Sequence, residues 1–225
     1  MGEITRLKWI ALAIGASGMV GCAGASKSAN EQNEPVQAMP LSSMASRPVV
    51  VLPVQYIAFS DSLSWSGGTS VQTGFMPYRA QFLYVLDDSI AASLGDRGLR
   101  SWTFARAIIA SARRNMGMTA DPLALAAERL RRQVKAGDDP VSEPLASQIR
   151  SLVALRDARY VILPAILRLE NKGTGARGSL LLYLIDTRTS RIAWSGQVSS
   201  DVSRTMSPAI AGSLAQQVAD LVAAR

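Results

Sequence analysis

The sequence predicts an α/β fold of the α+β kind, in which helices pack on a mixed sheet of four or five strands that ends in an antiparallel meander. Three apolar runs separated by turn residues, at 159–170, 179–186 and 192–198, predict the meander. The run PVVVLPVQ at 48–55, which is apolar and β-branched up to Gln55, predicts a strand that is buried on both faces. Between these runs, apolar residues recur with helical spacing, which predicts about five helices packed against the sheet.

The first half of the domain alternates between connections and expected helices. Residues 56–79 form a long connection rich in serine, glycine and aromatic residues. A helix is expected over 82–97, because one apolar stripe runs along it, and Gly98 then ends it. The stripe consists of Phe82, Val85, Leu86, Ile90 and Leu94. A short strand over 100–104 and a helix over 105–115 follow.

Capping residues and prolines predict the starts of three further helices. Asp121 and Pro122 begin the first, the sequence at 142–144 begins the second, and Pro208 begins the third. The aligned apolar residues are Leu123, Ala127, Leu130 and Val134 in the first, Leu145, Ile149, Leu152 and Val153 in the second, and Ile210, Leu214, Val218 and Leu221 in the third. Each stripe predicts a helix with one face buried on the sheet.

The meander is the strongest pattern in the sequence. Its first strand is expected to place five apolar residues on one face, namely Val161, Leu163, Ala165, Leu167 and Leu169. Its second strand is apolar on both faces, which predicts a central position. In its third strand, Ile192, Trp194 and Val198 alternate with small or polar residues. Residues 172–175 and 187–190 form the two turns.

Residues 1–21 have the pattern of a secretion signal. Arg6 and Lys8 precede an apolar stretch at 9–20 that ends in small residues. A membrane-spanning helix needs about 20 apolar residues, so this stretch is too short to be one. We therefore expect export and removal of residues 1–21, with an ordinary buried helix as the alternative.

The sequence Met19-Val20-Gly21-Cys22 resembles the lipobox of bacterial lipoproteins, with Met19 where leucine is usual. The resemblance implies that Cys22 carries a diacylglyceryl thioether and becomes the acylated amino terminus, which anchors the chain in a membrane. Two or three acyl chains hold a protein stably on a bilayer. Ala23, in place of aspartate, resembles the class that is sorted to the outer membrane and faces the periplasm. The inner membrane and the cell surface stay open as alternatives.

The expected organisation has three parts. A signal peptide occupies 1–21, the lipidated cysteine and a flexible tether occupy 22–47, and a single periplasmic globular domain occupies 48–225. The tether is rich in Ala, Ser, Asn, Gln and Pro, a composition that is typical of a flexible linker.

The composition argues against an enzyme. The chain has no histidine, which is the commonest general base and metal ligand, and its one cysteine excludes an internal disulfide or a multi-cysteine zinc site. Asp87 and Asp88 are adjacent on a helix, so they point in different directions and are expected to be solvated charges. We therefore predict no catalytic residue, no metal site and no cofactor.

Two segments are candidates for contact with an envelope protein partner. Aromatic residues among serine and glycine make adaptable contact surfaces. The long connection contains four of them, Phe59, Trp65, Phe75 and Tyr78, which alternatively fold back over the sheet edge. The basic candidates are Arg113, Arg114, Arg131 and Arg132, in a chain of net charge +7. Export argues against nucleic acid as the target of this charge.

Three segments resemble one family of envelope lipoproteins. They are VVVLPV at 49–54, ARYVILPAI at 158–166 and LYLIDTRTSRIAW at 182–194. With the order of elements, they resemble the domain of the penicillin-binding-protein activator lipoproteins and the curli secretion lipoprotein. Ser190 stands where glycine is usual. The resemblance implies a non-enzymatic protein that contacts partners, because some members activate cell-wall synthases and others build secretion pores.

Three functions stay open on the sequence alone. The first is a lipid-anchored binding or scaffold protein that assists cell-wall synthesis, export or surface assembly. The second is an oligomeric secretion or channel component, which predicts stable homo-oligomers. The third is an envelope hydrolase, which predicts activity that is lost when one carboxylate or serine is substituted. The absence of histidine makes the third the weakest.

Overall fold

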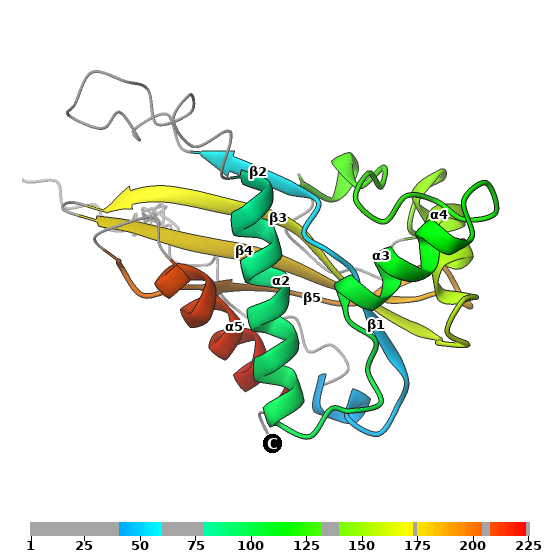
Figure 1. Cartoon of the computed structure of the whole chain (residues 1–225), viewed down its shortest axis with the longest axis horizontal. Helices are drawn as coiled ribbons and strands as arrows, with labels where there is room; N and C mark the ends of the chain where they lie inside the picture. Colours follow the sequence, from blue (N-terminus) through cyan, green and yellow to red (C-terminus); the bar gives the residue numbers. More distant parts are fainter. Residues whose placement is uncertain (1–40, 60–78, 132–139, 173–174, 204–207, 224–225) are drawn as a thin grey trace, which may run out of the picture. The chain divides into compact units, whose positions relative to one another are not determined.

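Five strands form one mixed sheet, and three of them make the expected meander (Figure 1). β3 (Tyr160–Lys172), β4 (Gly175–Asp186) and β5 (Arg191–Ser199) pair antiparallel in that order. β1 (Val49–Val51) and β2 (Tyr56–Phe59) both pair parallel with β3, along the edge that β4 leaves open. The α+β class, the mixed sheet and the central place of β4 are therefore confirmed.

This computed structural model describes residues 41–59, 79–131, 140–172, 175–203 and 208–223, and at residues 59, 79, 131 and 223 it describes the backbone alone. One unit, Pro35–Arg225, contains all of them. Residues 1–40 lie outside the described part, so the expected signal peptide, lipidated cysteine and tether stay predictions.

Helices cover the sheet and leave a buried core on each face. α2 (Arg79–Asp96) and α5 (Pro208–Ala223) pack side by side on one face (Figure 1). α4 (Leu145–Val153) packs on the other, and α3 (Ala105–Arg114), which contacts β1, adds Ile108 to the same core. All described residues of both cores lie between positions 41 and 222, within the unit that starts at Pro35.

The expectation that five apolar residues of the first meander strand share one face is wrong. The pairing of β3 with β4 skips Ala165, which forms a β-bulge, and one extra residue reverses the alternation beyond it. The residues that face the α4 core are Val161, Leu163 and Ala165, and those that face the α2–α5 core are Leu167 and Leu169. A second bulge at Ala193 likewise turns Ile192 and Trp194 toward opposite cores.

The helix expected from Asp121 onward does not form. Turns occupy this segment, followed by a single short 3-10 helix, η4 (Glu128–Arg131). The buried side chain of Gln55 binds the segment's backbone instead: its Nε2 donates to the Pro122 carbonyl at 3.0 Å, and its Oε1 accepts from the Leu125 amide at 3.0 Å. These backbone groups are therefore held by a side chain from the β1–β2 connection rather than by helical hydrogen bonds.

The remaining differences concern short elements. Of the strand expected over 100–104, Thr103 alone pairs with the sheet, through hydrogen bonds to the backbone of Val49 and Val51. β2 forms within the stretch that was expected to be a connection. A further 3-10 helix, η2 (Leu41–Met44), adds two buried side chains to the α2–α5 core. Among the helices that the structure describes, none has both the length and the apolarity to cross a membrane.

Candidate functional site

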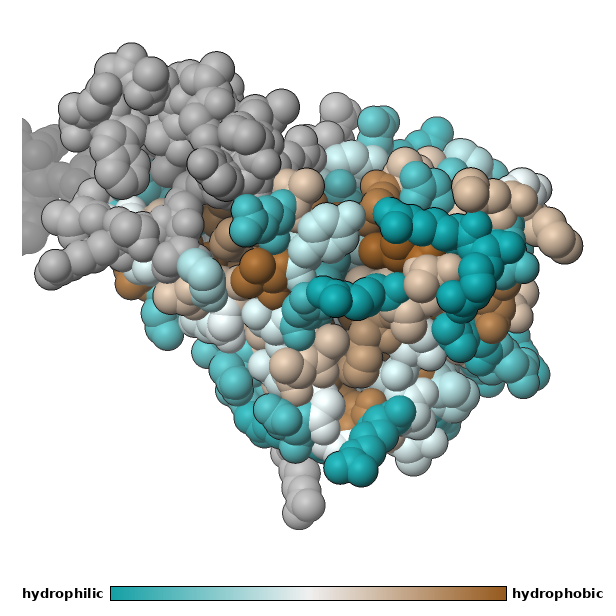
Figure 2. All heavy atoms as spheres, viewed as in Figure 1, coloured by the Kyte–Doolittle hydropathy of each residue, from teal (hydrophilic) through white to brown (hydrophobic). Residues whose placement is uncertain are grey.

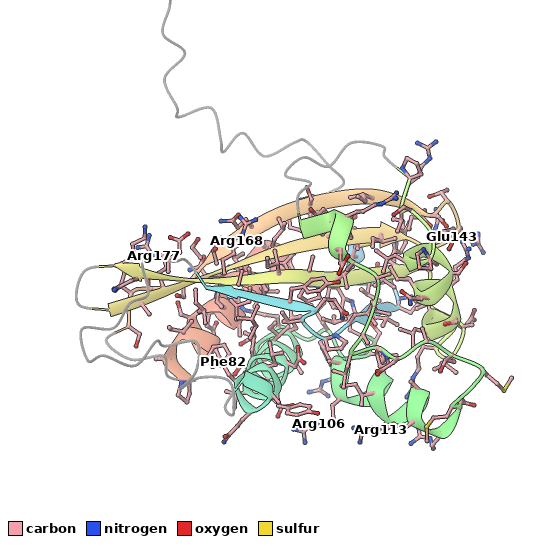
Figure 3. The ribbon with its side chains drawn as sticks, turned by 90° about the horizontal axis from the view of Figure 1, so that it is seen from above. Phe82, Arg106, Arg113, Glu143, Arg168 and Arg177 are labelled. Carbon is pink, nitrogen blue, oxygen red and sulfur yellow. The ribbon has the colours of Figure 1, made fainter. Side chains whose placement is uncertain are left out.

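A groove of about 320 Å³ lies between α2 and α3. Its lining consists of Tyr84, Asp87 and Asp88 from α2, and Arg106, Ile109, Ala110 and Arg113 from α3. Residues three or four positions apart share a helix face, so two regular helix faces build this groove. Figure 2 shows hydrophilic side chains over α3 and next to α2, beside hydrophobic surface. Figure 3 shows Arg106 and Arg113 projecting on the same side of the molecule, away from the sheet.

The charges of the groove are only partly neutralised. Asp88 and Arg106 form an ion pair, with side chains that are 49% and 77% exposed. An ion pair with this exposure contributes about 0–1 kcal/mol to stability. Arg113 is exposed and forms neither a hydrogen bond nor an ion pair with any residue that the structure describes. Its positive charge is therefore available to a bound partner.

Asp87 differs from its neighbour, because it is partly buried. Burial raises the pKa of Asp87 from 3.8 to about 7; a hydrogen bond from the Val54 amide opposes the rise, and the charge of Asp88 adds to it. The expectation that both aspartates are solvated charges is therefore wrong for Asp87. The sequence holds one signal for this position, since Asp87 lies directly beside the buried Leu86 of the apolar stripe.

The backbone of the β1–β2 connection explains why a carboxyl group lies here. The amides of Leu52 and Gln55 donate to carbonyl groups of β3, and Pro53 has no amide hydrogen. Val54 is 2% exposed, and buried amides nearly always find an acceptor. The Asp87 carboxyl supplies that acceptor. Asp87 thus joins α2 to the strand connection while it lines the groove.

A second buried carboxyl group lies at the end of β4. Arg159 donates two hydrogen bonds from Nε and one from Nη2 to Asp186, the last at 2.6 Å, and its guanidinium lies 5.0 Å from the Tyr160 ring centre. Burial acts to raise the pKa of Asp186, but hydrogen bonds from Arg159 and from the backbone of Arg188 and Thr189 outweigh it, so the pKa is lowered. This cluster holds the β4–β5 turn against the start of β3.

The groove is better suited to binding than to catalysis. A carboxyl group with a pKa near neutrality resembles a general acid, but acid–base chemistry needs a second group that faces it. Asp88 is paired with Arg106 instead. In the described ranges, no group of three or more His, Cys, Asp or Glu residues is placed to hold a metal ion. Tyrosine and arginine, which this groove presents, are the residue types enriched at the centres of protein interfaces.

The structure places few of the predicted contact residues. Arg113 lines the groove, and Arg114 lies next to Ser111, to which its Nη2 donates. Phe59 ends β2 and Arg131 ends η4, each described by its backbone alone. Outside the described residues lie Cys22, Trp65, Phe75, Tyr78 and Arg132. The roles of these residues stay predictions.

Comparison with known proteins gives matches among solved structures alone. No protein-family model and no curated protein matches this chain. The LpoB C-terminal domain from Salmonella enterica is 14% identical, with a TM-score of 0.32 over 72% of this chain and 94% of that one. The PelC dodecamer from Paraburkholderia phytofirmans is 12% identical, with a TM-score of 0.39 over 85% and 96%. Lipoprotein GNA1162 from Neisseria meningitidis is 17% identical, with a TM-score of 0.36 over 79% and 97%.

Two of these matches, LpoB and lipoprotein GNA1162, are of the kind that the sequence resemblance names. With TM-scores this low, the likeness carries no argument about the site. The function proposed below therefore rests on this chain's own residues.

Proposed function

We propose that this chain is a lipid-anchored, non-enzymatic binding protein of a bacterial envelope, and that the α2–α3 groove binds an envelope protein partner. Acyl chains on Cys22 hold it at the outer membrane, facing the periplasm. The observation that carries the proposal is the groove, where an exposed tyrosine and a guanidinium without a described partner flank a partly buried carboxyl group.

The chemistry of the groove supports a protein partner with a protruding polar side chain. Tyr84 is 44% exposed and offers an aromatic surface at the rim. Arg113 suits a carboxylate of the partner, with which a guanidinium forms two parallel hydrogen bonds. The hollow of about 320 Å³ lies at the small end of ligand pockets, which fits one or two side chains better than a large substrate.

The amino-terminal sequence supports the anchor. Met19 to Cys22 form the lipobox-like stretch, and the residues up to Arg47 form the expected tether. A flexible tether of this length has a root-mean-square reach of roughly 25–30 Å. The domain would therefore stay close to the bilayer yet be free to engage proteins embedded in it or bound to the cell wall.

Site-specific photocrosslinking in intact envelopes tests the binding role. A benzophenone amino acid at position 84 is expected to form an adduct with one envelope protein. Position 202 is the matched control, because Val202 is 46% exposed and Tyr84 is 44% exposed. An adduct at both positions, or at neither, contradicts the proposal.

A charge reversal makes this test specific to the groove. Arg113→Glu is expected to remove the adduct at position 84, because the partner's acidic group then meets a like charge. Arg177→Glu changes an exposed arginine on β4 and is expected to leave the adduct intact. An adduct that survives Arg113→Glu contradicts a role for the groove.

Metabolic labelling tests the anchor. Labelled palmitate is expected to enter the wild-type protein and to be absent from a Cys22→Ala variant. We expect this variant to leave the membrane fraction. Label that persists in Cys22→Ala refutes the lipid anchor.

One observation favours a hydrolase as the second candidate, namely the near-neutral pKa of Asp87. A hydrolase predicts turnover of a cell-wall or lipid substrate that Asp87→Asn abolishes. The binding function predicts that Asp87→Asn keeps the adduct at position 84, because the amide oxygen of asparagine still accepts from the Val54 amide. Substrate turnover by the wild type that fails in Asp87→Asn would establish the hydrolase instead.

A further inference from the structure

Two guanidinium groups from different elements converge on one hydroxyl at the end of α3. Arg114 Nη2 donates to Ser111 Oγ at 3.2 Å, and Arg156 Nη2 donates to the same oxygen at 2.7 Å. The two nitrogens therefore lie within about 6 Å of each other, a distance at which like charges repel. Such an arrangement favours a bound anion.

No carboxylate neutralises this pair in the described part of the chain. The acidic residues nearest along the sequence are Asp121 and Asp157, and no ion pair joins either of them to Arg114 or Arg156. The Asp121 carboxylate accepts the Leu123 amide instead. The charges of the two arginines are therefore open to an anion from outside the chain.

Two exposed methionines follow Arg114 closely along the chain. Met116 is 80% exposed and Met118 is 83% exposed, whereas large apolar side chains are generally buried. Each side chain therefore lies largely in solvent. Methionine side chains are flexible and apolar, and they adapt to irregular apolar surroundings.

The backbone holds these methionines outward. The Asn115 carbonyl accepts the Met118 amide at 3.1 Å, and Gly117 has a φ of 86°, which favours glycine. The Ala120 amide donates to Ser151 Oγ at 3.1 Å, which joins the segment to α4. The exposure of Met116 and Met118 is therefore built into a hydrogen-bonded turn.

We propose that the α3-end surface, defined by Arg114, Met116, Met118 and Arg156, docks on the surface of an anionic phospholipid bilayer. The two guanidinium groups bind lipid phosphates, and the two methionines enter the boundary between headgroups and acyl chains. The relevance of this docking rests on the proposed function, because the anchor on Cys22 and its tether keep the domain within reach of a bilayer.

A bilayer fits this surface better than an acidic protein does. A protein partner usually packs a central side chain into a hollow, whereas Met116 and Met118 project from the surface and none of the four residues lines the α2–α3 groove. Phosphates and a fluid apolar layer accept projecting groups without a shaped counterpart. The acidic protein is therefore the outcome that the experiment must separate.

The test uses the unit from Pro35 to Arg225, because it contains every core residue that the structure describes and lacks Cys22. Its partition is measured by flotation with vesicles of phosphatidylglycerol and phosphatidylcholine, and with vesicles of phosphatidylcholine alone. Binding to the anionic vesicles alone is expected. Because the unit carries no anchor, this result is independent of whether Cys22 is lipidated.

Paired variants connect the binding to the α3-end surface. Arg114→Gln with Arg156→Gln is expected to lower the partition coefficient about 25-fold, since each cation near an anionic surface contributes about fivefold. Met116→Ser with Met118→Ser is expected to lower it about tenfold. Arg100→Gln with Arg177→Gln removes the same total charge from exposed arginines on other elements and is expected to change it less than about twofold. Circular dichroism verifies that each variant is folded.

Four results overturn the proposal. They are equal binding to both kinds of vesicle, no binding to either, equal losses in the two arginine pairs, and displacement by millimolar inorganic phosphate. The last identifies a site for free phosphate. A photocrosslink from position 118 to an acidic envelope protein, with no vesicle binding, identifies a protein surface. In that case the adduct from position 84 still reports separately on the proposed function.

Discussion

Two carboxyl groups of this chain, one buried and one partly buried, have pKa values that are shifted in opposite directions. The side chain of Asp186 is 11% exposed; burial acts to raise its pKa, but hydrogen bonds from Arg159 and the turn backbone outweigh burial and lower it. Burial raises the pKa of Asp87 on α2 to about 7, because a single backbone amide opposes the rise and the charge of Asp88 adds to it. Burial acts to raise the pKa of both carboxyl groups. The number of hydrogen-bond donors to each carboxyl group, and whether one of them is charged, therefore decides the direction in which its pKa is shifted.

The difference separates a structural site from a site suited to binding. Asp186 is neutralised inside the chain and holds the β4–β5 turn. No ion pair among the described residues includes Asp87, and this residue lines the α2–α3 groove. A titratable side chain that has no oppositely charged partner within the chain is available to a ligand.

The largest expected effect comes from breaking the Asp186 site. Arg159→Met leaves the mostly buried Asp186 carboxylate without its main donor and is expected to lower the free energy of unfolding near pH 7. The pKa of Asp186 is lowered, so its contribution is present above the ordinary value of 3.8 and is lost as the pH falls through the folded value. Urea unfolding of both proteins near pH 7 and pH 3 measures this loss, which is expected to shrink in acid.

Arg188→Met is the control for this substitution. Arg188 lies in the same turn and is exposed, and its backbone amide rather than its side chain binds Asp186. We expect a change of less than about 0.5 kcal/mol. An equal loss in both variants would show that the turn, and not the Arg159 pair, carries the stability.

Asp87→Asn is expected to stabilise the protein in alkaline solution. Between pH 3.8 and about 7 the unfolded chain ionises while folded Asp87 keeps its proton, so stability falls as the pH rises and stays low above 7. Asparagine avoids this cost while its oxygen still accepts from the Val54 amide. The free energy of unfolding is expected to rise by about 1–2 kcal/mol near pH 8, a figure that already allows for solvent screening at the groove. No gain is expected near pH 3.5. Thermal unfolding across this range measures it; a pH-independent difference contradicts the assignment.

Ser190→Gly is expected to raise stability by less than about 1 kcal/mol. Ser190 has a φ of 52°, the left-handed region that glycine adopts at little cost. This explains physically why the resembling family prefers glycine at the position. The gain is offset by loss of the 2.7 Å hydrogen bond from Arg150 Nη1 to Ser190 Oγ. Ser190→Ala removes that bond and keeps the strain, so a variant less stable than Ser190→Gly is expected in parallel denaturant titrations.

The smallest effect sharpens the account of Asp87. Asp88→Asn removes the adjacent charge and is expected to lower the pKa of Asp87 somewhat, while leaving it well above 3.8, because burial is the larger cause. Stability is expected to change by less than about 0.5 kcal/mol, since the pair with Arg106 is exposed. Carboxyl carbon shifts measured by NMR follow the titration. A return of the Asp87 pKa to its ordinary value would make the neighbouring charge, rather than burial, the main cause.

Periodicity predicted the sheet class, the meander and the helix faces correctly, because long apolar patterns directly reflect burial. Periodicity predicted the wrong face for strand residues where one extra residue changes the register. Ala165 and Ala193 are small and unremarkable in sequence, yet each inserts into a strand and reverses the faces beyond it. The helix expected at Asp121 failed for another reason, since Gln55 binds its backbone from a distant part of the chain.

The site was less predictable than the fold. Arg113 was named from charge density alone, and nothing in the sequence joins it to Tyr84 or Asp87 on another helix. The burial of Asp87 depends on how the β1–β2 connection passes beneath α2, which is a tertiary property. Adjacent aspartates on a helix correctly excluded a facing pair but gave no measure of how differently the two are solvated.

The Val54 amide can report on the state of the α2–α3 groove. The Val54 amide, next to a proline without an amide hydrogen, bonds to the Asp87 side chain, whose pKa is raised to about 7. Its proton resonance should therefore move with the ionisation of Asp87. A ligand that displaces water from the groove should alter its rate of hydrogen–deuterium exchange. The Val54 peptide group thus offers a spectroscopic measure of whether the groove is occupied, which can be used before any partner has been identified.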